Sequence, residues 1–72
     1  MGRRIILRDW LKNSRKKENL LQKELALLVD VDVTSIGKYE KGERRPSVDT
    51  AKKIAVVLGF DWTKFYEDEA KV

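Results

Sequence analysis

The stretch DVTSIGKYEKGERRPS, residues 32–47, decides how the rest of the chain is interpreted. Its first ten residues have helical spacing, with Ile36 and Tyr39 on one face. Gly37 interrupts the opposite face, although a glycine inside a helix costs about 1 kcal/mol relative to alanine. Two arginines and a proline follow directly. The pattern predicts a short helix over 33–41 with one apolar face, one nearly bare face and a basic segment at its end.

Helices are predicted on both sides of this stretch, because apolar residues recur at helical spacing and no strand-like alternation is sustained. Two lie before it, over roughly 5–18 and 21–29. Two follow it, one between the cap Ser47 and Gly59 and a short one after Asp61. The residues expected to face the core are Leu7, Trp10, Leu11 and Ser14 in the first helix; Leu25, Ala26, Leu28 and Val29 in the second; Ile36 and Tyr39 in the third; Val48, Ala51, Ile54, Ala55 and Leu58 in the fourth; and Trp62, Phe65 and Tyr66 in the fifth.

Individual residues define where these helices begin and end. Asn19 and Asp30 tolerate the left-handed conformation in which helices often end. Asp32 can cap the helix over 33–41 by accepting hydrogen bonds from free backbone amides, and Gly42 ends that helix. An all-α chain of five short helices is therefore predicted.

Length and composition bound the class of protein. A chain of 72 residues with 42% hydrophobic residues can form one small domain. It has no cysteine and no histidine, so it lacks thiolate metal ligands and the commonest general base of enzymes. No signal peptide or long apolar run is visible. We therefore expect a cytoplasmic protein that is not an enzyme, does not bind a membrane and needs no metal or cofactor.

The charge is unevenly distributed along the chain. Residues 1–46 contain 12 Lys or Arg and 7 Asp or Glu, a net of +5; residues 47–72 contain 4 and 5, a net of −1, and the sum is the net charge of +4. The basic excess therefore lies in the part that contains the unusual helix. It favours an anionic partner, although a solvated basic surface is the alternative.

Several residues recur at a characteristic spacing around this helix: Gln22, Glu24-Leu25-Ala26, Val31, Ser35-Ile36, Glu40 with Gly42, Pro46-Ser47 and Leu58-Gly59. They make the segment 21–62 resemble the Cro/phage-repressor family of helix-turn-helix proteins, also called the xenobiotic-response-element family. The likeness extends over roughly residues 7–66. It implies one compact five-helix domain of the lambda-repressor type over residues 1–72, with the motif at about 21–41, a basic N-terminal tail at 1–4 and an acidic C-terminal tail at 67–72.

The resemblance implies that the helix over 33–41 enters the major groove of double-stranded DNA. The family's base-reading positions fall on Val33, Thr34, Gly37 and Lys38. Lys38 can donate to O6 and N7 of guanine, and Val33 and Thr34 can pack on a thymine methyl group. Long amide or arginine side chains are usual in the family at these positions and are missing here, so we expect DNA shape to contribute to specificity.

Two residues of this helix have alternative interpretations. Gly37 either allows the helix to approach DNA closely or is simply neutral at an exposed site. Asp32 either caps the helix or accepts a hydrogen bond from a cytosine amino group, and the cap is the favoured interpretation.

Phosphate contacts are expected from Gln22, at the start of the second helix, and from Lys41, Arg44 and Arg45. Solvation of an ordinary loop is the alternative for the two arginines.

The resemblance also pairs Arg15 with Glu40 in a structural ion pair between the first and third helices. The chain departs from the family at Leu21, where a capping Ser or Thr is usual, and at Ser14, where a leucine is usual.

The function implied is that of a sequence-specific DNA-binding regulator of transcription, a repressor that binds a palindromic operator as a homodimer. A contact through Trp62, Phe65 and Tyr66 is one interface for such a dimer, although all three can instead close the core of one chain. For Trp62 and Phe65 the two roles are equally expected, so Tyr66 and the corner between the fourth and fifth helices are the better candidates for the contact. The alternative function is that the same fold serves as a protein-interaction module with weak DNA specificity.

Overall fold

The computed structural model describes residues 7–70 and contains five α-helices. They are α1 (Asp9–Lys17), α2 (Gln22–Val29), α3 (Val33–Lys41), α4 (Val48–Leu58) and α5 (Lys64–Ala70). No strand occurs between residues 7 and 70, so the all-α prediction is confirmed. The basic segment 1–4, the predicted first two residues of the first helix, and positions 71–72 of the acidic tail lie outside the described residues.

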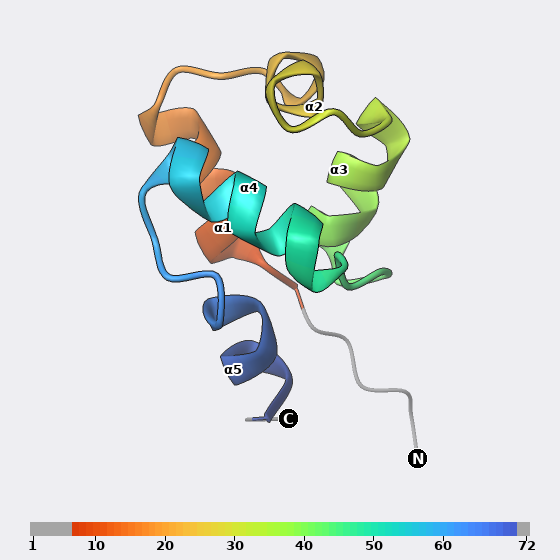
Figure 1. Ribbon diagram of the computed structural model, residues 1–72, viewed down its shortest axis with the longest axis vertical. Helices are drawn as coiled ribbons and strands as arrows, with labels where there is room; N and C mark the ends of the chain where they lie inside the picture. The colour runs from red at the N-terminus through yellow and green to blue at the C-terminus, as the bar shows by residue number, and fades with distance from the viewer. Residues whose placement is uncertain (1–6, 71–72) are drawn as a thin grey trace.

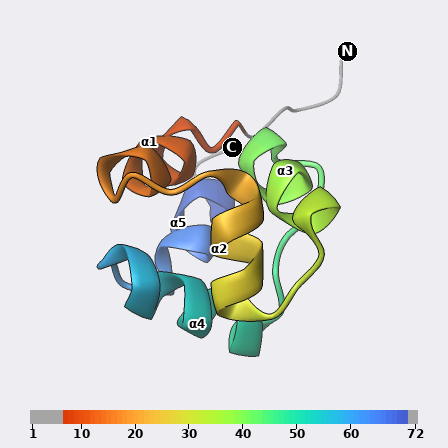
Figure 2. The same cartoon turned by 90° about the horizontal axis from the view of Figure 1, so that it is seen from above.

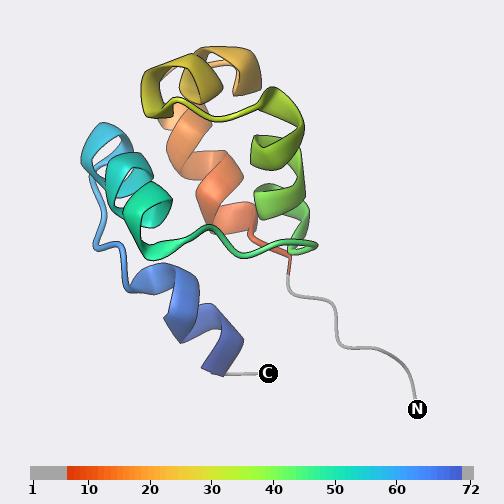
Figure 3. The same cartoon turned by 45° about the vertical axis from the view of Figure 1, so that its right-hand side comes forward.

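The helices pack around one core, with α2 and α3 at one end of the molecule and α5 at the other (Figures 1 and 3). Seen from above, α2 lies between α3 and α4 (Figure 2). The three-residue connection between α2 and α3 leaves no room for the two helices to separate. The buried residues come from every helix: Leu11, Leu25, Ala26, Val29, Ile36, Tyr39, Ala51, Ile54, Leu58 and Phe65.

Several helix ends lie at the residues that were predicted to define them. Asn19 and Asp30 have φ angles of 60° and 58°, in the left-handed region. The Asp32 carboxylate accepts from the Thr34 amide at 3.0 Å, and the Ser47 hydroxyl accepts from the Thr50 amide at 3.2 Å. These contacts fix the direction in which α3 and α4 leave their turns.

Leu21 does not cap α2 with its side chain, but the first turn keeps the other half of a capping box. The carboxylate of Glu24 accepts from the Leu21 amide at 2.8 Å. This bond satisfies one of the amides that precede the helix.

Three predicted core residues are exposed instead. Leu7 precedes α1 and is 60% exposed, Leu28 is 60% exposed, and Val48 is 45% exposed. Leu28 has helical spacing from Leu25, but the buried side of this short helix is narrow and runs through Leu25, Ala26 and Val29. Val48 is the first residue of α4 and lies beyond the part of that helix that other elements cover.

The two ends of the chain also differ in detail from the prediction. α1 begins at Asp9, later than expected, and α5 begins at Lys64, so Trp62 lies in the turn before it. Asp61 accepts from both the amide and the hydroxyl of Thr63, at 2.9 and 2.7 Å. Asp61 therefore stabilises that turn rather than the first residues of the helix itself.

Candidate nucleic-acid interface

The outer face of α3 carries the four residues predicted to read bases. Val33 is 41% exposed, Thr34 is exposed, and Gly37 and Lys38 are half-buried. On the inner face, Ile36, Tyr39 and Glu40 are buried. Among these four residues Lys38 is the one long donor, and the other three have short side chains or none.

Gly37 is not required by packing inside the molecule. A Cβ atom placed there would lie 3.9 Å from both Nε2 and Oε1 of Gln22, an ordinary van der Waals contact. Its φ angle is not in the left-handed region, unlike those of Gly42 and Gly59. The glycine is thus not needed for local backbone geometry, and the lack of a side chain matters only on the outer face of α3.

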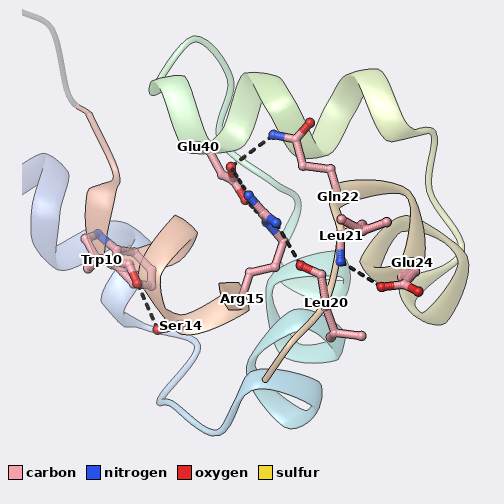
Figure 4. A network of polar contacts seen from close by, with 8 residues as sticks. All are labelled: Trp10, Ser14, Arg15, Leu20, Leu21, Gln22, Glu24 and Glu40. Carbon is pink, nitrogen blue, oxygen red and sulfur yellow. Dashed lines mark hydrogen bonds and ion pairs between the residues drawn. The ribbon is translucent and has the colours of Figure 1, made fainter. Parts of the chain in front are cut away.

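A buried network of polar side chains joins α1, α2 and α3 (Figure 4). The Arg15 guanidinium donates to the Glu40 carboxylate from Nε at 2.6 Å and from a terminal nitrogen at 3.2 Å. Gln22 Nε2 donates to Glu40 Oε1 at 3.0 Å. The Arg15 and Glu40 side chains are 7% and 5% exposed, so the ion pair is buried and fixes how α3 lies against α1.

Arg15 is further constrained by the backbone. Its second terminal nitrogen donates to the Leu20 carbonyl at 2.8 Å, directly before α2 (Figure 4). One guanidinium therefore holds both helices of the motif to α1. The Gln22 amide oxygen points away from Glu40 (Figure 4).

Lys41, Arg44 and Arg45 lie at the C-terminal end of α3, and all three are exposed. A terminal nitrogen of Arg44 donates to the Ser35 hydroxyl at 3.3 Å, which brings the guanidinium back along α3. The Arg45 guanidinium lies 4.9 Å from the ring centroid of Tyr66. The structure thus places one arginine beside α3 and orients the other toward α5.

Arg8 is a structural residue that the sequence analysis missed. It is 1% exposed, and a terminal nitrogen donates to the Tyr39 and Arg44 carbonyls at 2.9 and 3.1 Å. Its guanidinium also lies 5.4 Å from the centre of the Phe65 ring, and its amide donates to the Glu40 carbonyl at 2.9 Å. Arg8 therefore ties the segment before α1 to the end of α3. A single arginine in a basic N-terminal region gives no signal of such burial.

Asp32 caps α3, as the Thr34 amide contact shows. The carboxylate is committed to the backbone of its own helix. A negative charge at this end of α3 is stabilised by the helix dipole.

Among the side chains that the structure describes, no group of three or more His, Cys, Asp or Glu could hold a metal ion. None of the helices described is long and apolar enough to cross a membrane.

The three aromatic residues proposed for a dimer contact differ in burial. Phe65 is completely buried between Trp10 and Phe60, with ring centroids at 5.2 and 5.7 Å. Phe65 therefore closes the core of one chain and cannot serve as an interface residue. Trp62 and Tyr66 are half-buried and contact each other edge to face at 5.8 Å.

The chain is similar to known proteins over most of its length. A family model described as helix-turn-helix matches residues 11–65. The chain is also 41% identical over 63 residues to YqaF of Bacillus subtilis (strain 168), described as an uncharacterised HTH-type transcriptional regulator. That alignment covers 88% of this chain and 83% of YqaF. Together with the α2–α3 geometry, these matches show that the protein belongs to the helix-turn-helix family, in its Cro/phage-repressor or xenobiotic-response-element branch.

Proposed function

We propose that this protein is a sequence-specific, double-stranded DNA-binding regulator of transcription, a repressor that binds a palindromic operator as a homodimer. The observation that carries the proposal is the outer face of α3, where small or flexible side chains are exposed beside Lys41, Arg44 and Arg45. One α-helix fits the major groove of B-DNA, and its exposed face then meets the base edges. The family membership and the description of YqaF as a regulator support a binding protein rather than an enzyme.

Each residue on the outer face of α3 has a role in this proposal. Lys38 donates to guanine O6 and N7, Val33 and Thr34 contact thymine methyl groups, and Gly37 allows close approach. Lys41, Arg44 and Arg45, with Gln22 at the start of α2, contact phosphates, which fix the position of α3 in the groove. The basic N-terminal part of the chain contributes an attraction that is independent of sequence.

A selection from random duplexes, followed by titrations at several salt concentrations, tests the proposal. The selected site should be roughly palindromic and should be bound more tightly than a scrambled duplex. Lys38→Ala should relax the preference at one base position per half-site, at a cost of about 1–3 kcal/mol. Arg44→Ala combined with Arg45→Ala should weaken binding to every duplex and reduce the salt slope by up to about two units. Equal affinity for selected and scrambled duplexes would disprove sequence-specific regulation.

One observation favours the alternative of a protein-interaction module. Leu21, Leu27 and Leu28 are 57%, 82% and 60% exposed on or beside α2. Exposed apolar side chains in one region are typical of protein contacts. The selection separates the two functions, because a module that only binds protein enriches no duplex sequence.

A further inference from the structure

A small hollow lies where the start of α1, the first residue of α2 and the outer face of α3 meet. Its volume is about 220 Å³. The lining residues are Leu7, Asp9, Lys12, Gln22, Gly37, Glu40 and Lys41.

The polar groups of this hollow suit an anion. Lys12 of α1 and Lys41 of α3 are both exposed cations on its walls. Gln22 adds an amide whose orientation is fixed by the 3.0 Å hydrogen bond to Glu40 (Figure 4). The two ammonium groups and the second hydrogen of Gln22 Nε2 are donors that phosphate oxygens accept well.

The carboxylates of the lining do not cancel this preference. The charge of Glu40 is compensated by Arg15, whose Nε lies 2.6 Å from Oε2. Asp9 is the remaining carboxylate, and it is exposed in the first turn of α1, where the helix N-terminus already attracts negative charge. The two lysines therefore outnumber the one carboxylate that no arginine compensates.

Gly37 keeps the hollow open. A Cβ atom at this position would reach the Gln22 amide at 3.9 Å, so a longer side chain would extend into the space in front of that amide. The glycine that leaves α3 bare thus also exposes the Gln22 amide to a ligand.

We propose that this hollow receives one phosphate of the duplex backbone, and that Lys12 of α1 is a phosphate contact. The inference rests on the proposed function. When α3 lies in the major groove, a phosphate strand must pass along one side of it, and the hollow adjoins the same outer face. Sequence analysis did not assign Lys12, because α1 precedes α3 by a full helix and only the fold brings the two together.

A comparison of two lysines on α1 tests the inference. Lys12→Gln removes a cation from the hollow, and Lys16→Gln removes another exposed lysine a turn further along that does not line it. Lys12→Gln should lower the salt slope by about 0.9 on the selected and the scrambled duplex alike, and Lys12→Arg should restore it. Lys16→Gln should leave the slope unchanged. The slope is independent of the fraction of active protein, so partial unfolding does not obscure it.

Neutral methylphosphonates, placed singly along the selected duplex, locate the phosphate. The wild-type protein should lose affinity at one position per half-site, and Lys12→Gln should be insensitive to neutralisation at that position. Equal sensitivity of the two proteins at every position would overturn the proposal, as would equal slopes for Lys12→Gln and Lys16→Gln.

Two further outcomes separate the possible sources of failure. Inorganic phosphate and chloride, compared at equal ionic strength, should inhibit DNA binding equally; stronger inhibition by phosphate would make the hollow a site for the free anion and overturn the assignment to DNA. A wild-type protein that binds no duplex would overturn the proposed function and this inference together. Normal wild-type binding with a silent Lys12→Gln overturns the inference alone.

Discussion

At the scale of single residues, two buried arginines hold the DNA-facing helix in place. Arg15 is neutralised by the carboxylate of Glu40, whereas Arg8 donates to the carbonyls of Tyr39 and Arg44. In both cases the contacts stabilise a guanidinium charge whose burial without partners would cost free energy. Arg15 fixes the position of α3 against α1 and α2, whereas Arg8 holds the C-terminal end of α3.

Arg15→Ala should lower the free energy of unfolding by about 3–5 kcal/mol, because it leaves the Glu40 carboxylate buried without its partner. Replacing both Arg15 and Glu40 by neutral residues should cost less than the single change. Chemical denaturation of the three variants measures both effects. A loss within about 0.5 kcal/mol for the single variant would show that the pair contributes nothing to stability.

Arg8→Met should lower the free energy of unfolding by at least about 2 kcal/mol, because the buried Tyr39 carbonyl and the partly buried Arg44 carbonyl lose a donor while the packing of the stem is largely kept. Lys16→Met is the matched control, since Lys16 is exposed on α1 and its change should stay within about 0.5 kcal/mol. Urea titrations of the two variants measure this difference. Similar values for both would mean that the Arg8 guanidinium is dispensable.

At the scale of elements, Gly37 lowers the stability of α3 relative to alanine and leaves the outer face of the helix bare. Gly37 has room for a Cβ atom and an ordinary helical backbone, so alanine would be the better residue by helix propensity alone. The other glycines near helix ends are different. Gly42 and Gly59 end α3 and α4 with φ angles of 75° and 79°, which other residues adopt only with strain.

Gly37→Ala should raise the free energy of unfolding by up to about 1 kcal/mol and weaken binding to the selected duplex. Gly59→Ala is an informative contrast. No atom would lie within 4 Å of its new Cβ, yet the positive φ angle should make it destabilising by roughly 1 kcal/mol. Thermal unfolding and duplex titration of both variants measure the two effects. A Gly37→Ala variant that is more stable and binds DNA normally would refute the role in close approach.

The turn before α5 should make a small pH-dependent contribution to stability. Hydrogen bonds from the hydroxyl and then the amide of Thr63 hold the pKa of Asp61 below its ordinary value of 3.8. Because the folded-state pKa is the lower one, the stabilisation is fully present above the ordinary pKa and is lost as the pH falls through the lowered value. The difference in stability between the wild type and Asp61→Ala should therefore be constant above about pH 5 and shrink below it. A difference that grows on acidification would contradict the assignment.

At the scale of the whole molecule, α3 and the α4–α5 corner lie on opposite sides of the fold (Figure 3). The α4–α5 corner has an open groove with an exposed apolar side chain, Val56, which is 84% exposed. The groove is lined by Lys52, Ala55, Val56, Phe60, Asp61 and Trp62. A dimer contact at this groove would leave the outer face of α3 uncovered in both chains.

The proposed homodimer should place two recognition helices about 34 Å apart, one turn of the duplex, so that two chains bind one operator. Sedimentation with and without the duplex measures the stoichiometry. Val56→Asp should weaken binding to the full palindrome at least tenfold and leave binding to a half-site unchanged, because only the full site gains from a linked second chain. One chain bound per full site with complete sequence preference would exclude the dimer.

Local patterns of residues were enough to predict the helices, most of their ends and the family. The caps Asp32 and Ser47 and the left-handed residues Asn19 and Asp30 were predicted because each interaction joins residues at most a few positions apart. The outer face of α3 could also be read from spacing, since Ile36 and Tyr39 alone define which side is covered.

Which apolar side chains are covered and which charges are buried depends instead on how the helices pack together. Leu7, Leu28 and Val48 fit a helical pattern but are exposed. The sequence pattern allows Phe65 to be either an interface or a core residue, and its packing against Trp10 places it in the core. Arg8 is a core residue because the fold brings the carbonyls of Tyr39 and Arg44 to its guanidinium, although they are 31 and 36 positions away in the sequence. Burial depends on which distant elements supply apolar surface and hydrogen-bond partners, and no local pattern of residues encodes that supply.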